Sequence, residues 1–104
     1  MDELKVLSVI MGFTARYVAP DPQFDNYMII NRYKTINKCE VICSMKDWLI
    51  NEGYDVLSGG LEDGKYSCYL DTQHTPADVL NAHYADTEYE AVVKACLWAI
   101  EKDK

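Results

Sequence analysis

One helix near the end of the chain constrains the fold more than any other stretch. Residues 87–101 read TEYEAVVKACLWAIE. Thr87 and Glu90 have the spacing of a capping box, in which both side chains accept hydrogen bonds from backbone N–H groups at a helix start. At about 100° per residue, Glu90, Lys94 and Glu101 fall in one narrow arc, and apolar residues cover nearly all the rest. Such a helix needs neighbours on several sides and must lie inside the domain.

The same helix carries a stripe of small side chains. Ala91, Ala95 and Ala99 are spaced four residues apart and therefore share one face. Small side chains allow another helix or a sheet to approach closely. Three helices with wide apolar faces would also leave more hydrophobic surface than one small sheet can cover. We therefore expect a homodimer whose contact uses the alanine stripe or Trp98.

Length and composition indicate an ordinary globular protein. A chain of 104 residues has the length of one domain with its own core, so we treat residues 1–104 as a single globular domain. No apolar run approaches the roughly 20 residues of a membrane span. The acidic start MDELKV also lacks the basic region of a signal peptide. We expect a cytoplasmic protein that does not bind membranes.

Two further helices are predicted from hydrophobic spacing. Residues 2–15 and residues 36–51 each carry a broad apolar arc and a narrow polar strip. Thr35 or Asn37 is expected to cap the second helix, and Gly53 stands where helices often end in a left-handed residue. Both helices therefore need cover from the same core as the last one.

Strands are predicted between the helices. The glycines of SGGLEDG, between two runs of strand-forming residues, predict a hairpin. Pro20 and Pro22 make residues 17–27 a loop, because proline has no backbone N–H for regular pairing. The expected strands are residues 27–33, 54–57, 65–70 and 80–84. The order α-β-α-β-β-β-α predicts an α+β fold, a layered sandwich of one small, mainly antiparallel sheet of three to four strands with three helices.

The net charge lies in one part of the chain. The formal charge is −7, and residues 54–93 contain eight carboxylates against one lysine, Lys65. Such a surface repels phosphates, so we expect no direct binding to nucleic acid. It attracts a basic partner protein, although a purely solubilising surface is the simpler interpretation.

Tyrosines accompany these carboxylates. Tyrosine is favoured at binding surfaces because it supplies a large contact area at a low cost in entropy. The combination predicts a surface that binds a partner; the alternative is that the tyrosines are half-buried residues of the sheet. The residues that we predict in this surface are Glu62, Asp63, Tyr66, Tyr69, Asp86, Glu88 and Tyr89.

Cysteines and histidines supply the candidates for metal or catalytic chemistry. Two cysteines four residues apart on a predicted helix suggest a metal site, but a C-x₂-C pair is absent and the histidines are far apart in sequence. Without a secretory signal, the cysteines are better interpreted as reduced core residues. No signature of nucleophilic catalysis or of a phosphate-binding loop is present. We therefore expect no metal, cofactor or enzymatic activity. The candidates are Cys39, Cys43, Cys68, Cys96, His74 and His83.

Four short sequence segments, spread over almost the whole chain, resemble segments of known proteins. They are VIMGF at residues 9–13, CSMKDWLINEG at 43–53, YSCYL at 66–70 and ADTEYEAVVKACLWAI at 85–100. Together with the predicted order of elements, they resemble the phage ABA sandwich domain family of small phage and prophage proteins. The resemblance implies helices on both sides of a sheet, and it brings no catalytic motif.

These features favour a non-enzymatic accessory protein of a phage or prophage that acts by binding another protein in the host cytoplasm. Its partner would be a basic host or phage protein, for example a host defence complex that it inhibits. Two alternatives stay open. The chain could bind or sequester a small ligand in a pocket between helix and sheet, or it could be a structural domain with no dedicated site.

Overall fold

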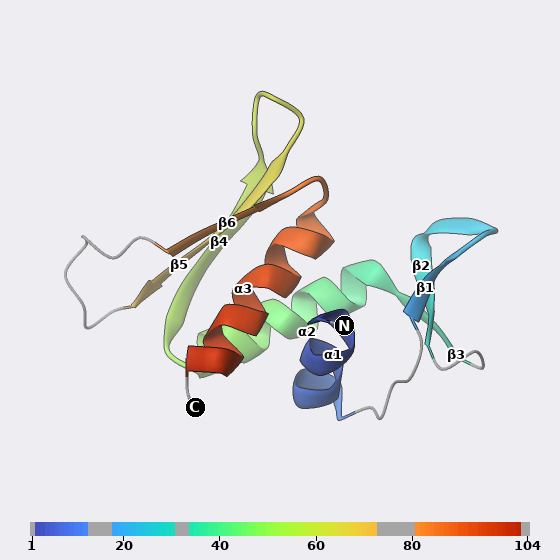
Figure 1. Cartoon of the computed structure of the whole chain (residues 1–104), viewed down its shortest axis with the longest axis horizontal. Helices are drawn as coiled ribbons and strands as arrows, with labels where there is room; N and C mark the ends of the chain where they lie inside the picture. Colours follow the sequence, from blue (N-terminus) through green and yellow to red (C-terminus); the bar gives the residue numbers. More distant parts are fainter. Residues whose placement is uncertain (1, 13–17, 31–33, 73–80, 103–104) are drawn as a thin grey trace.

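The computed structural model describes residues 2–12, 18–30, 34–72 and 81–102. Within these residues the chain forms three helices and two antiparallel sheets of three strands each (Figure 1). The helices are α1 (Asp2–Met11), α2 (Lys38–Asn51) and α3 (Glu88–Lys102). The strands are β1 (Val18–Asp21), β2 (Phe24–Ile30), β3 (Lys34–Asn37), β4 (Tyr54–Gly60), β5 (Tyr66–Thr72) and β6 (Asn81–Ala85).

The predicted α+β class, with antiparallel strands and three helices, is confirmed. The strands, however, form two sheets where one was expected. Sheet A has the order β1-β2-β3, and sheet B has the order β4-β5-β6. The 14 residues of α2 connect them, since β3 leads directly into this helix and β4 follows it. At about 1.5 Å per residue, α2 holds the two sheets roughly 20 Å apart.

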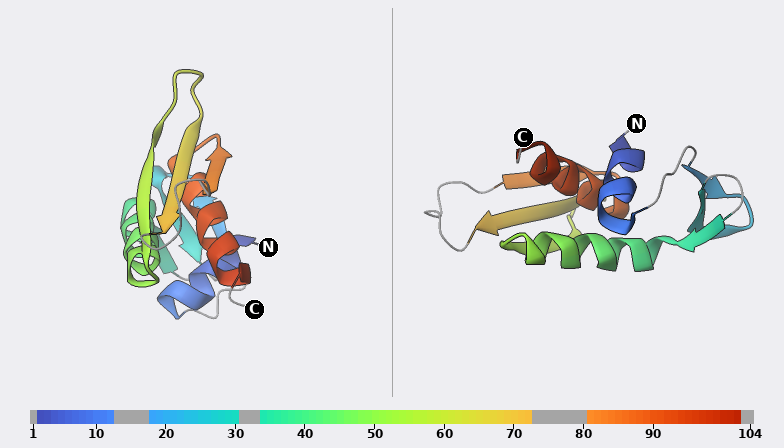
Figure 2. Two further views of the ribbon diagram at one scale, coloured as in Figure 1. Left: turned by 90° about the vertical axis from the view of Figure 1, so that its left-hand side faces the viewer. Right: turned by 90° about the horizontal axis from the view of Figure 1, so that it is seen from below.

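The elements form a flat molecule with extents of 44 × 34 × 19 Å. Viewed from the side, α1 and α3 lie in one layer, while α2 and β4 lie in the other (Figure 2). Sheet B therefore has α3 against one of its faces. Its other face points away from the helices, in contrast to the two-sided cover that the sequence resemblance implies.

Helix α3 lies at the centre of the packing, as its apolar surface predicted. It contacts α1, α2 and all three strands of sheet B. Its start is also as predicted, because the Glu90 N–H donates to Thr87 Oγ at 3.2 Å. Ala91 and Ala95 are fully buried, and Ala99 is 1% exposed. The alanine stripe packs inside the chain and is not available for a dimer contact, so Trp98 remains the predicted contact of a homodimer.

The stretch predicted as a loop is a hairpin. Strand β1 ends at Asp21, and β2 begins at Phe24. Pro20 is tolerated because β1 is an edge strand, where one missing N–H breaks no ladder on its outer side. Pro22 occupies the turn, and Asp21 Oδ1 accepts from the Gln23 N–H at 2.8 Å. Proline and aspartate therefore mark a turn between paired strands. β2 also lies earlier than the predicted strand 27–33, of which residues 31–33 are outside the described residues.

The bounds of α1 and α2 differ from those predicted. Helix α1 ends at Met11 because Gly12 has a positive φ of 71°; the predicted continuation over 13–15 lies outside the described residues. Ile36 belongs to β3, where it faces Met28 across the ladder. Helix α2 therefore begins at Lys38, with Asn37 as its cap. The helix ends at Asn51 and is followed by Gly53 with a φ of 98°, as predicted.

Only one narrow face of helix α2 packs against the core. Val41, Met45 and Leu49 are fully buried, whereas Cys39 and Cys43 on another side are exposed free thiols. The prediction that these two cysteines point into the core is wrong, because the sheets and α3 cover a narrower arc of α2 than its apolar residues suggest. Cys68 and Cys96, also free, are buried as predicted. None of the described helices is long and apolar enough to cross a membrane.

Candidate functional site

The hairpin of β4 and β5, with β6 beside it, presents one face to solvent. Residues directly opposite in an antiparallel pair point to the same side of the sheet. Leu57 faces Tyr69, which faces Ala82, while Val56 and Leu70 form a row that points the other way, toward the helices. The residues that define the outer sheet face are Asp55, Leu57, Tyr69, Asp71 and Tyr84.

Large apolar and aromatic side chains of the outer sheet face are open to water. Leu57 is 70% exposed and Tyr84 is 48% exposed. The rings of Tyr69 and Tyr84 meet edge-to-face, with centroids 6.2 Å apart, and their hydroxyl oxygens are 3.4 Å apart. This hydrogen bond raises the pKa of the Tyr84 hydroxyl. The Tyr84 hydroxyl thus remains protonated and able to donate a hydrogen bond.

Two carboxylates stand at one end of this apolar strip. Asp55 and Asp71 are direct partners across β4 and β5. Like charges in such positions destabilise a strand pair by roughly 0.2–1 kcal/mol. The two carboxylates, together with Leu57 and Tyr69, line a shallow cavity of about 510 Å³. The arrangement suits a group that carries both an apolar body and a positive charge.

The structure divides the seven predicted partner-binding residues among three places. Tyr69 lies on the outer sheet face. Glu62 and Asp63 lie in the exposed turn between β4 and β5. The other four line a separate groove of about 460 Å³ beside the first turns of α2 and α3. These four are Tyr66, Asp86, Glu88 and Tyr89.

This groove is less acidic than its sequence suggests. Glu88 pairs with Lys46 at 3.3 Å, and Asp86 pairs with Lys65 at 3.8 Å. Of its two tyrosines, Tyr66 is 37% exposed, whereas Tyr89 is only 7% exposed and belongs to the core. Tyr89 is therefore not the surface residue that was predicted. The outer sheet face is the stronger candidate, because its opposed carboxylates accompany large exposed apolar side chains.

Sequence reasoning missed four residues of the outer sheet face. They lie on three neighbouring strands, and the alternation of side chains along each strand was the signal that could have placed them on one side. The strand ends and the register between strands were needed to use that signal. The residues missed are Asp55, Leu57, Asp71 and Tyr84.

A row of polar residues crosses the opposite face of sheet B, beneath the helices. Ser58, Cys68 and His83 stand side by side on β4, β5 and β6. Cys68 is fully buried, and burial raises the pKa of its thiol to about 11. Burial and nearby Lys94 lower the pKa of His83. The thiol therefore stays protonated and out of reach of a substrate, although the row resembles a nucleophile and its base.

In the residues that the structure describes, no three or more His, Cys, Asp or Glu side chains gather closely enough to hold a metal ion. The chain matches no protein-family model, no curated protein and no solved structure. The likeness to the phage ABA sandwich family therefore stays a prediction from the sequence.

Proposed function

We propose that this chain is a non-enzymatic accessory protein that acts by binding another protein, and that the partner docks on the outer sheet face. The observation that carries the proposal is the exposure of Leu57 beside the tyrosine pair Tyr69–Tyr84. Contiguous apolar and aromatic side chains on a solvent-facing surface are typical of interaction sites. Tyrosine in particular supplies contact area at a low entropic cost.

The partner is expected to present a basic segment. The aliphatic stem of a lysine or arginine would lie along Leu57 and Tyr69, and its charged head would meet Asp55 and Asp71. Such a cation would be attracted to both carboxylates and would offset the repulsion between them. A net charge of −7 would further speed the encounter with a basic surface.

The biological setting follows from the sequence resemblance. A phage or prophage protein of this kind could inhibit a host defence complex that handles nucleic acid. Such a complex carries a basic groove for phosphates, and an acidic face with exposed tyrosines is suited to occupy it. A second copy of this chain is the competing occupant of the outer sheet face, but two copies would each bring a net charge of −7.

The test is affinity capture from lysates of candidate host cells, followed by measurement of the affinity for each protein recovered. Leu57→Ser removes the apolar contact, and Asp71→Asn removes one of the charges. Ile50→Ser is the matched control, because Ile50 is 55% exposed on α2, outside the outer sheet face. We expect the affinity to fall with the first two variants and to remain unchanged with the control.

Salt and mass measurements complete the test. Binding of a basic partner should weaken as salt is raised, since exposed charges are screened. A partner that binds both outer-face variants as tightly as the original chain would overturn the proposal. Light scattering that shows a dimer, abolished by Leu57→Ser, would assign the outer sheet face to a second copy instead.

A further inference from the structure

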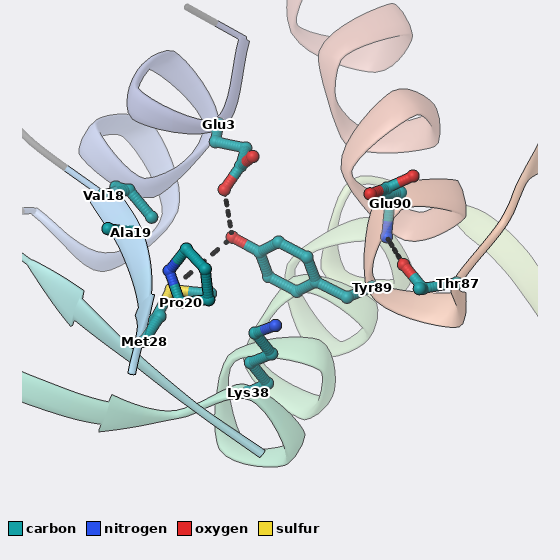
Figure 3. Close-up of a pocket in the computed structure, with 9 residues that line it drawn as sticks. All are labelled: Glu3, Val18, Ala19, Pro20, Met28, Lys38, Thr87, Tyr89 and Glu90. Atoms are coloured by element: carbon teal, nitrogen blue, oxygen red, sulfur yellow. Dashed lines mark hydrogen bonds between the residues drawn. The ribbon is translucent and has the colours of Figure 1, made fainter. Parts of the chain in front are cut away.

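A second cavity lies at the opposite end of α2, between α1, sheet A and the first turn of α3 (Figure 3). Its volume is about 190 Å³. A dry cavity of about 150 Å³ is large enough for benzene, so this one suits a ligand of roughly six to nine non-hydrogen atoms. The residues that line it are Glu3, Val18, Ala19, Pro20, Met28, Lys38, Thr87, Tyr89 and Glu90.

Tyr89 organises the polar side of the cavity. Its side chain reaches from α3 toward α1, and its hydroxyl donates to Glu3 Oε2 at 3.2 Å (Figure 3). The same hydroxyl lies 3.7 Å from Met28 Sδ. Burial, followed by the charge of Glu3, raises the pKa of Tyr89. The hydroxyl therefore remains a donor at neutral pH and holds the Glu3 carboxylate in one place.

The cavity holds charges of both signs. Lys38 Nζ lies 5.8 Å from the centroid of the Tyr89 ring, whereas Glu3 lies at the hydroxyl end of that ring (Figure 3). Within the described part of the chain, neither Lys38 nor Glu90 forms an ion pair. Two carboxylates against one ammonium disfavour a phosphate or another multiply charged anion.

We propose that this cavity binds a free α-amino acid with a small aliphatic side chain. The ammonium group of the ligand pairs with the Glu3 carboxylate, and its carboxylate pairs with the Lys38 ammonium. Its aliphatic side chain packs against Pro20 and Met28, which form part of the apolar wall. A zwitterion matches the charges better than a simple amine or acid does, because each end meets a group of opposite sign.

The experiment uses L-valine, isobutylamine and isobutyrate as probes of the full chain. Binding is followed by NMR shifts of the Met28 methyl group and by calorimetry. We expect valine to bind saturably and each half-molecule to bind at least tenfold more weakly, since each lacks one of the two charge-assisted hydrogen bonds.

Charge-neutral variants assign the two ends of the ligand. Lys38→Met should weaken valine binding by roughly tenfold or more and leave isobutylamine binding unchanged. Glu3→Gln keeps an acceptor for the Tyr89 hydroxyl and should weaken both amine-bearing probes. The matched controls are Lys102→Met and Glu101→Gln at the far end of α3, and they should bind valine as the original chain does.

Three results would overturn this inference. The first is the absence of a saturable shift at millimolar valine. The second is equal binding of valine and isobutyrate, which would show that the amino group meets no partner. The third is unchanged valine affinity in Lys38→Met. Melting temperatures of all variants identify any loss caused by unfolding, and Lys38→Met stays informative if Glu3→Gln is unstable, because Lys38 forms no ion pair in the described part of the chain.

Discussion

Replacing Asp71 by asparagine should stabilise the protein and, at the same time, weaken its binding of a partner. Asp71 stands directly opposite Asp55 on the outer sheet face. Their repulsion costs roughly 0.2–1 kcal/mol, and asparagine keeps the size of the side chain while it removes the charge. For a domain of this size, the expected gain raises the melting temperature by roughly 1–8 °C.

The dependence of stability on salt concentration distinguishes the repulsion between Asp55 and Asp71 from other effects of the substitution. The free energy of unfolding is measured by urea titration at about 0.01 M and about 1 M salt, where the Debye length falls from roughly 30 Å to roughly 3 Å. The gain in Asp71→Asn should shrink markedly at high salt. Asp47→Asn, at an exposed position of α2, lowers the net negative charge equally and is the matched control. It should change the stability by less than about 0.5 kcal/mol.

Two outcomes would refute this reasoning. If Asp71→Asn is no more stable than the original chain at low salt, the opposed carboxylates do not repel each other measurably. If Asp47→Asn gives the same gain, the effect belongs to the total charge and not to the pair. A further variant, Asp71→Lys, places an ion pair across the strands with Asp55. It should be at least as stable as Asp71→Asn and should bind a basic partner least well.

Three further predictions concern the core. Ala95→Leu should lower the free energy of unfolding by about 1–3 kcal/mol, because Ala95 is fully buried and the added atoms overpack the helix contacts; urea titration measures the loss. His83 has a lowered pKa in the folded chain, so the unfolded state binds more protons. The free energy of unfolding should have its full value above a pH of about 6.5 and should decrease as the pH falls toward the pKa of His83 in the folded chain. The variant His83→Gln should not show this decrease. A thiol reagent should modify the exposed Cys39 and Cys43 in the native protein, and the buried Cys68 and Cys96 only after unfolding. Mass spectrometry identifies the modified residues.

The helices could be predicted well because their signals are local. The Thr87 cap, the apolar spacing of α3 and the glycine after α2 are all contained in a few adjacent residues. The faces of the helices were harder to predict. In α2 the apolar residues cover a wider arc than the neighbours do, and only the packed chain reveals that Val41 is buried and Cys39 is exposed.

The sheets could be predicted only in part because pairing depends on distant residues. The hairpin of β4 and β5 was visible from its glycine-rich connection. The split into two sheets was not, since no local pattern tells whether β3 pairs with β2 alone or also with β5. Pro20 and Pro22 misled for a related reason, because proline disfavours a central strand but is accepted at an edge or in a turn.

The candidate site shows the same limit. Tyr69 and Tyr89 were both assigned to one acidic surface, but Tyr69 lies on the outer sheet face beside Asp55 and Asp71, and Tyr89 lies in the core. A tyrosine has an apolar ring and a polar hydroxyl, so its sequence context does not decide between the two positions. The decision for Tyr89 depends on Glu3, 86 residues away, which accepts its hydrogen bond inside the molecule.

Both proposals place binding where the packing of the chain leaves surface unused. Because α3 contacts α1, α2 and all of sheet B, one face of sheet B is covered and the other faces water. Because α2 separates the sheets, the cavity forms at the end where sheet A meets α1 and the first turn of α3. No residue lines both this cavity and the cavity of the outer sheet face. Lys38→Met should therefore leave partner binding unchanged, and Asp71→Asn should leave valine binding unchanged. Loss of both functions in a variant that keeps the melting temperature of the original chain would show that the two sites are coupled.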